Sequence, residues 1–148
     1  MNFIEQKLES LGLRLEGAKP PVGNYLGCKV IGDLLYASGR VSELKGVIGT
    51  DVSHEQARQA ARDTVLLILS IVKQEIGNLD MIDGVVKVQG FLRCSPDFIA
   101  LPNVLDGASD LLITLFGEKG KHARTATGVA QLPFGASIQL DMIFQLKK

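Results

Sequence analysis

The C-terminal part of the chain restricts the fold most, because two runs of alternating residues flank a short segment that contains proline and glycine. The runs extend over residues 124–131 and 137–146, and Leu132–Gly135 separates them. Alternation with period two is typical of β-strands that have one buried face, and a loop of this length is common in hairpins. The pattern therefore predicts an antiparallel hairpin from Lys121 to Leu146.

Arg124 begins the first run among small neighbours, and two interpretations of it are open. A planar guanidinium with space beside it can bind both oxygens of a small carboxylate. Alternatively, Arg124 is a solvated arginine on an edge strand, because most charged side chains are exposed. In a regular hairpin Gln139 lies opposite Gly128, on the same face as Arg124 and on the order of 13 Å from it by strand rise. This separation predicts a small ligand between the two side chains.

Composition and charge exclude several classes of protein. The chain has 148 residues, enough for one domain over residues 1–148 with a full hydrophobic core. Lys+Arg and Asp+Glu are both 16, and this balance argues against nucleic acid or an anionic membrane as a partner. Cys28 and Cys94 lie far apart without ligand-like neighbours, which predicts no metal site and a reducing cytoplasm. We recognise no signal peptide and no membrane-spanning run.

Hydrophobic spacing and turn residues divide the rest of the chain into helices and strands. Ser53 and Gln56 have capping-box spacing at the start of the clearest helix, and Gly77 is a suitable residue to end it. Gly32-Asp33 between two apolar runs is a signal for a tight hairpin. The expected elements are helices over residues 3–11, 53–76 and 102–116, a helical turn over 79–82, and strands over 25–31, 34–38, 85–94 and the two C-terminal runs.

This order of elements predicts an α+β fold, in which one mixed or antiparallel sheet carries two main helices on one face, with a short N-terminal helix in addition. The other face of such a sheet is either polar or covered by a partner chain. We assign Thr125, Val129, Leu140 and Phe144 to that face. Because such a face is too apolar to be wholly solvated, we predict a homo-oligomer.

Several segments together resemble one protein family. The run from Arg124-Thr125-Ala126 to Leu132-Pro133, with the last strand, resembles the C-terminal signature of the RidA/YjgF family. These proteins are the reactive intermediate deaminases, which older nomenclature calls endoribonuclease L-PSP or translation inhibitor. Gly23-Asn24-Tyr25 and Leu35–Gly39 resemble the N-terminal strands of the family, and Asp106–Ser109 resembles its longer branch. The resemblance covers nearly the whole chain, from Pro20 to Leu146.

The resemblance implies both a fold and an activity. The implied fold is chorismate-mutase-like and forms a homotrimer, with ligand sites in the clefts between subunits. The implied activity is that of a cytoplasmic enamine/imine deaminase, a hydrolase that uses no metal or organic cofactor. Its substrates are small carboxylate metabolites, namely 2-imino acids and their enamine tautomers of the 2-aminoacrylate type. The products are 2-keto acids and ammonia.

Matching positions with the family gives the candidate substrate-binding residues. Arg124 matches the arginine that binds the substrate carboxylate, and Tyr25 and Ser38 match residues that line the pocket. Asp106 lies near the position of a pocket asparagine, and Ala126 stands where many members have a cysteine.

Gln139 is the departure from the family pattern that matters most, because deaminating members have at this position a glutamate that orients the attacking water. A glutamine accepts a hydrogen bond but cannot take a proton. The resemblance therefore implies a deaminase with catalytic residues Arg124 and Gln139 and weakened catalysis, or a non-catalytic carboxylate binder that regulates a partner. A third alternative is the endoribonuclease of the older name, against which zero net charge and the lack of paired histidines count. His122 is expected on the same side as Arg124.

Overall fold

The computed structural model describes residues 2–148 and contains one five-stranded sheet with the order β1-β2-β5-β3-β4. The only parallel pair in this sheet is β3 with β4, and the other neighbours are antiparallel. The predicted α+β class with a mixed sheet is therefore confirmed. The strands are β1 (Cys28–Ile31), β2 (Leu34–Val41), β3 (Ile82–Arg93), β4 (Ala123–Val129) and β5 (Ile138–Leu146).

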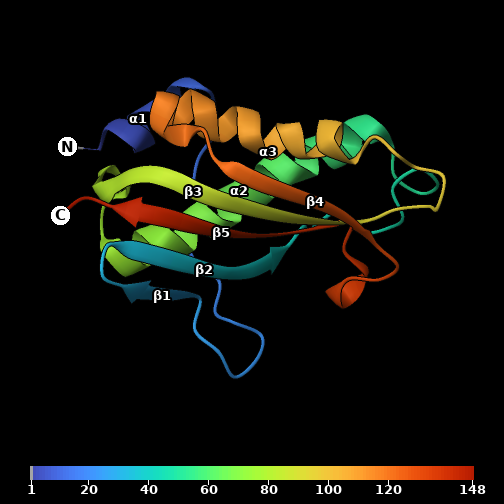
Figure 1. The fold of residues 1–148 in the computed structure, drawn as a ribbon, viewed down its shortest axis with the longest axis horizontal. Coiled ribbons are helices and arrows are strands. Elements are labelled where there is room, and N and C mark those ends of the chain that lie inside the picture. Colours follow the sequence, from blue (N-terminus) through green and yellow to red (C-terminus); the bar gives the residue numbers. More distant parts are fainter. Residues whose placement is uncertain (1) are drawn as a thin grey trace.

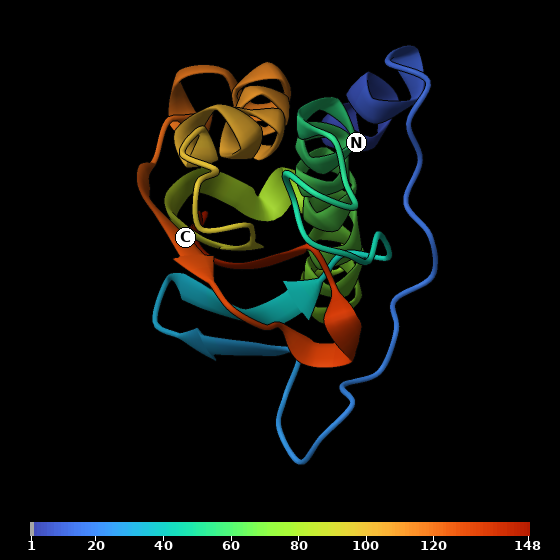
Figure 2. The ribbon, with the colours of Figure 1, turned by 90° about the vertical axis from the view of Figure 1, so that its right-hand side faces the viewer.

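Two main helices pack against one face of the sheet, as predicted. In Figure 1 α2 lies behind the strands and α3 runs along the side of β4. Figure 2 shows the segment after α1 running along the outside of α2 before it reaches β1. None of the helices among residues 2–148 is long and apolar enough to cross a membrane. The helices are α1 (Phe3–Ser10), α2 (His54–Ile76) and α3 (Leu101–Phe116), with 3₁₀ turns η1 (Leu79–Met81), η2 (Gly117–Gly120) and η3 (Pro133–Gly135).

Local signals in the sequence identified several boundaries correctly. Ser53 and Gln56 form the predicted capping box, in which the Gln56 amide donates to Ser53 Oγ at 3.1 Å and the Ser53 amide donates to Gln56 Oε1 at 2.9 Å. Gly77 ends α2 with φ 86°. Gly32-Asp33 joins β1 to β2, although β1 begins at Cys28 rather than at residue 25.

The predicted hairpin from Lys121 to Leu146 is wrong, because β4 and β5 are not neighbours. β5 lies between β2 and β3, and β4 pairs with the other edge of β3. Four inward side chains of β5, Ile138, Leu140, Met142 and Phe144, are at most 1% exposed, so this strand needs a neighbour on each side. The small and polar residues of β4 suit a sheet edge. The segment around Pro133 is therefore a crossing connection. Alternation in the sequence identifies strands but does not identify their partners.

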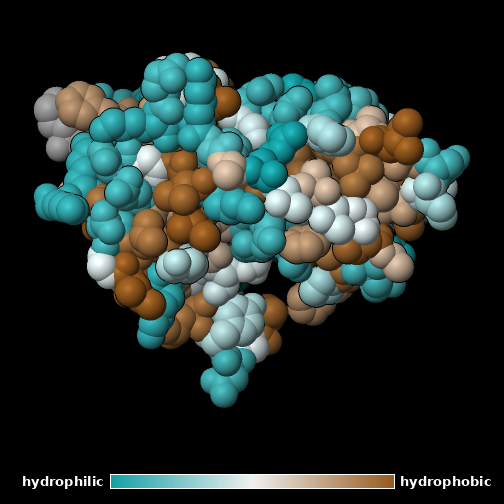
Figure 3. All heavy atoms as spheres, in the orientation of Figure 1, coloured by the Kyte–Doolittle hydropathy of each residue, from teal (hydrophilic) through white to brown (hydrophobic). Residues whose placement is uncertain are grey.

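The face of the sheet that carries no helix is mixed in character. Leu140 and Phe144 were assigned to this face, but both are completely buried under the helices, and the assignment is wrong. The strands present instead Tyr36, which is paired with Ile143, and Phe91, which is paired with Gln139. Figure 3 shows apolar and polar residues interleaved on the side where the strands lie in front. The homo-oligomer remains a prediction, now supported by different residues.

Gly120 allows the chain after α3 to pass close to the helix backbone. A Cβ at this position would clash with the carbonyl oxygen of Leu112 and would lie 2.9 Å from the Cα of Ile113. Backbone atoms of a helix cannot move aside as a flexible side chain can. The approach of η2 to α3 therefore requires glycine here.

We expect Gly120→Ala to lower the free energy of unfolding by about 1–3 kcal/mol, the usual effect of overpacking a tight contact. The measurement is the midpoint of urea unfolding followed by circular dichroism. Gly17→Ala is the control, because a Cβ at Gly17 has no heavy atom within 4 Å, and we expect a change within about 0.5 kcal/mol. Equal midpoints for the two variants would contradict the packing described here.

Candidate functional site

Arg124 lies on β4 with its side chain on the helix-covered face of the sheet. In the register of the strands it is aligned with Val88 of β3, which is aligned with Met142 of β5. Val88 and Met142 are buried under the helices, and residues aligned across a sheet share a face. The Arg124 side chain is 21% exposed. It is therefore not the solvated edge-strand arginine of the simpler interpretation.

One face of α3 holds the Arg124 guanidinium. Nη1 donates to Asp106 Oδ1 at 2.8 Å and to Ser109 Oγ at 3.0 Å, and Nη2 donates to the Pro102 carbonyl oxygen at 3.2 Å. Pro102, Asp106 and Ser109 are four and three residues apart, so they lie along one side of the helix. The guanidinium therefore has a fixed position and already has a carboxylate partner from its own chain.

His122 extends this network behind Ser109. Its Nδ1 lies 2.6 Å from the Gly120 carbonyl oxygen, which can only accept, so Nδ1 carries the proton. In the neutral ring Nε2 then accepts from the hydroxyl of Ser109, 2.9 Å away. The expectation that His122 lies on the same side as Arg124 is thus correct, and Ser109 links the two side chains. Ser109 follows Asp106 by three residues, and this helical spacing is the signal in the sequence from which its contact with Arg124 could have been expected.

Gln139 does not share a face with Arg124, contrary to the expectation from the hairpin. Its aligned neighbours are Phe91 of β3 and Val41 of β2, and it is on the face without helices. The distance of about 13 Å derived from a regular hairpin no longer applies, since the strands are not paired. A small ligand cannot bridge the two side chains within one chain.

Tyr25 and Gln139 instead line a common cavity of about 350 Å³ between residues 17–25, the end of β2 and η3. Val22 and Phe134 provide apolar walls of this cavity, and Arg40 lies on it as well. The structure thus brings together two of the predicted site residues, Tyr25 and Gln139. It places them apart from Arg124 and Asp106.

Ser38 fixes the segment that carries Tyr25. Its hydroxyl donates to the Leu26 carbonyl oxygen at 2.5 Å, and its amide donates to the Gly27 carbonyl oxygen at 2.9 Å. Ser38 lies where the pairing of β2 with β5 shifts register, between Ala37 and Arg40. The hydroxyl therefore positions the residues next to Tyr25 through these bonds.

Ala126 follows Arg124 by two residues in β4, so both lie on the same face of the sheet, and Ala126 is aligned with Gly90 of β3. It is partly buried and packs against the core, beside the place where Leu105 approaches Gly90 closely. A methyl group offers no polar contact, so Ala126 contributes shape to this region.

Arg40 and Phe134 also line the cavity, although neither was expected from the sequence. The guanidinium of Arg40 donates to the carbonyl oxygens of Lys19 and Pro20 at 3.1 and 3.3 Å, and its buried Nε has no partner among the described residues. Phe134 is the only non-glycine with positive φ among residues 2–148, at φ 60°. Strained backbone of this kind is frequent at functional sites. No local pattern in the sequence indicates either role.

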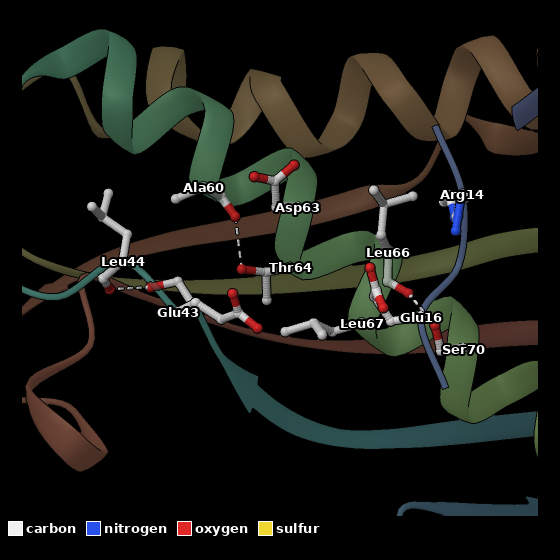
Figure 4. A pocket seen from close by; sticks show the side chains of 11 residues that line it. Arg14, Glu16, Glu43, Leu44, Ala60, Asp63, Thr64, Leu66, Leu67 and Ser70 are labelled. Atoms are coloured by element: carbon white, nitrogen blue, oxygen red, sulfur yellow. Dashed lines mark hydrogen bonds between the residues drawn. The ribbon is translucent and has the colours of Figure 1, made fainter. Parts of the chain in front are cut away.

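A second cavity of about 240 Å³ lies between α2 and the extended segment that follows α1 (Figure 4). It has charged walls, to which Arg14, Glu16 and Glu43 contribute. The hydroxyls of Thr64 and Ser70 donate to carbonyl oxygens one turn back in α2, at 2.7 and 2.9 Å. None of the predicted site residues lines this cavity. Residues 2–148 contain no group of three His, Cys, Asp or Glu side chains that could hold a metal ion.

Cys28 is a buried free cysteine. The pKa of its thiol is raised to about 11, mainly because the thiol is buried and also because Glu75 is near, while the charge of Arg40 opposes the shift. Burial also raises the pKa of Cys94, which is less enclosed. Both thiols are therefore protonated at neutral pH, and neither provides a ready nucleophile.

The chain is similar to known proteins over nearly its whole length. The family described as "YjgF/chorismate mutase-like, putative endoribonuclease" matches residues 5–145. "Protein TCP17" of Trypanosoma cruzi is 36% identical over 97% of this chain and 94% of its own length. "Putative regulator AldR" of Lactococcus lactis is 30% identical over 88% and 93%. The crystal structure of Atu1372 from Agrobacterium tumefaciens, a protein of unknown function, is 38% identical, with a TM-score of 0.92 over 98% and 93% of the two chains.

We expect iodoacetamide at pH 8 to modify Cys94 of the native protein much faster than Cys28. The reason is that only the thiolate reacts and the fold both encloses Cys28 and keeps it protonated. The measurement is mass spectrometry of peptides after timed alkylation. In urea both thiols should react at similar rates, and fast native labelling of Cys28 would contradict the burial described here.

Proposed function

This chain belongs to the RidA/YjgF family, and on that premise we propose that it hydrolyses small 2-imino acids to 2-keto acids and ammonia. The substrates include the enamine tautomers of the 2-aminoacrylate type. We propose that the reaction takes place in a cleft between two copies of the chain in a cytoplasmic homotrimer. The unpaired Cys28 and Cys94 fit a reducing compartment.

The observation that supports a shared site is the separation of its two halves within one chain. The guanidinium of Arg124 is on the helix-covered face at one sheet edge, and Gln139 is on the other face beside the cavity of Tyr25. These halves cannot contact one small molecule within a single chain. β4 has a partner on only one side, so its free edge is available to a second copy. Repetition of such a head-to-tail contact closes into a ring.

The chemistry requires few groups. The carbon of a protonated imine is electrophilic, so water adds to it, and ammonia leaves as the carbonyl forms. Arg124 would bind the carboxylate of the substrate, and Gln139 would accept a hydrogen bond from the attacking water. Tyr25 and Phe134 would exclude bulk water from the cavity. Positioning and preorganised charge account for the rate in such a site.

Release of ammonia from freshly generated 2-aminoacrylate tests the activity. We expect Arg124→Ala to lower kcat/KM by roughly 10–100-fold, as the loss of a hydrogen bond to a charged group predicts. Gln139→Glu should raise kcat, because a carboxylate can also take the proton of the water. Equal rates for the wild-type protein and Arg124→Ala would exclude the proposed role of Arg124.

Mixed oligomers test whether the site is shared between chains. Arg124→Ala and Tyr25→Ala should each be impaired alone. If the halves come from different copies, random 1:1 mixing after joint refolding restores roughly a quarter of the sites in a symmetric ring. The measurement is the ammonia rate of the mixture against each parent refolded alone. A mixture no faster than its parents would show that the site lies within one chain.

A second candidate function is that of a carboxylate-binding regulator without catalysis. It is favoured by Gln139, which keeps hydrogen bonding and lacks the charge of a base, and by similarity to a protein named as a regulator. Calorimetric binding of 2-ketobutyrate without any ammonia release would support it. The family description also names an endoribonuclease. The charge balance of the chain and the engagement of His122 with Ser109 and Gly120 count against that activity.

A further inference from the structure

The Arg124 site contains a negative charge of its own, which changes the kind of ligand that it prefers. Asp106 Oδ1 lies 2.8 Å from Arg124 Nη1. The pair is formally neutral. Because the two groups are adjacent, a simple carboxylate that approaches Arg124 also comes close to the carboxylate of Asp106. A neighbouring like charge disfavours such a ligand. A pocket with asparagine in place of Asp106 would not have this opposition.

No basic side chain other than Arg124 forms an ion pair with Asp106 among residues 2–148. Arg58 of α2 also contacts α3, but it is bound to Asp110 at 2.8 Å and to the Asn103 carbonyl oxygen at 2.8 Å. His122 is held as a donor to Gly120 and a partner of Ser109. The Asp106–Arg124 pair is therefore separate from the pair that Arg58 forms with Asp110.

Both members of the pair keep capacity for a ligand. A guanidinium has five N–H donors, and the contacts to Asp106, Ser109 and Pro102 use three of them. The Asp106 side chain is 43% exposed, and Oδ1 is its only oxygen with a hydrogen bond among residues 2–148. A ligand can thus contact a positive and a negative group side by side.

We propose that Asp106 makes this a site for dipolar ligands, in which Arg124 binds a carboxylate and Asp106 binds a cationic nitrogen on the adjacent carbon. This inference rests on the proposed function and names its preferred species, the protonated 2-imino acid. The reaction replaces the cationic C=NH₂⁺ group by a neutral C=O group, with water consumed and ammonium released. The 2-keto acid product then lacks the group that Asp106 binds, so it leaves more easily than the substrate. Asp106 also favours the protonated, more electrophilic imine.

Calorimetry with two stable ligands of the same carbon skeleton tests the proposal on the intact oligomer at pH 7.5. L-2-aminobutyrate carries the cationic nitrogen, and 2-ketobutyrate lacks it. We expect the wild-type protein to bind 2-aminobutyrate more tightly. Asp106→Asn should reverse the order by raising the affinity for 2-ketobutyrate about tenfold and lowering that for 2-aminobutyrate, since a like charge is removed and an ion pair is lost.

Two further variants keep the result interpretable. Asp106→Glu retains the charge and should retain the preference for 2-aminobutyrate. Asp83→Asn is the control, because it removes one carboxylate of β3 that pairs with Lys119 and with neither Arg124 nor Arg58, and it should leave the affinity ratio unchanged. Circular dichroism of each variant shows whether it has folded.

The proposal is overturned if the wild-type protein binds 2-ketobutyrate at least as tightly as 2-aminobutyrate, if it binds neither ligand, or if Asp106→Asn leaves the ratio unchanged. The ammonia assay separates this outcome from failure of the proposed function. A protein that shows the expected ratio but releases no ammonia is a dipolar-ligand binder without deaminase activity. If the protein releases ammonia but does not prefer 2-aminobutyrate, the proposed deaminase function stands and the proposed role of Asp106 is rejected.

Discussion

The burial of β5 in the middle of the sheet determines where the candidate site residues lie. Its inward residues Ile138, Leu140, Met142 and Phe144 are covered by the helices, and the hydrophobic effect favours neighbours on both sides of such a strand. β4 is therefore placed beyond β3, at the edge. The guanidinium of Arg124 is consequently carried to the margin of the sheet, on the opposite face from Gln139.

The contact between Arg124 and α3 fixes the guanidinium in place. An exposed ion pair contributes little to folding, and Asp106 is substantially exposed. The additional bonds to Ser109 and the Pro102 carbonyl oxygen hold the guanidinium in one orientation, which reduces the entropy lost when a ligand binds. The same contact introduces a negative charge beside a positive one. The network around Arg124 therefore suits the binding role that we propose for it better than a role in stability.

Local signals in the sequence were sufficient for much of the fold but for less of the site. The capping box at Ser53 and the turn at Gly32-Asp33 depend on neighbouring residues, so they could be predicted. The pairing of β4 with β3 depends on contacts between distant residues, and alternation carries no information about it. For the same reason the separation of Arg124 from Gln139 could not be predicted. The position of Phe134 with its positive φ also had no local signal.

The two halves of the candidate site draw on different parts of the polypeptide. Arg124, Asp106, Ser109 and His122 all come from one continuous stretch that runs from β3 through α3 to β4. The cavity of Tyr25 and Gln139 combines residues from the N-terminal half of the chain with residues 133–139. The charge-bearing half is therefore a self-contained β–α–β module. The charged residues of this module and the shape of the separate cavity are therefore open to independent variation, during divergence of the family or in engineering.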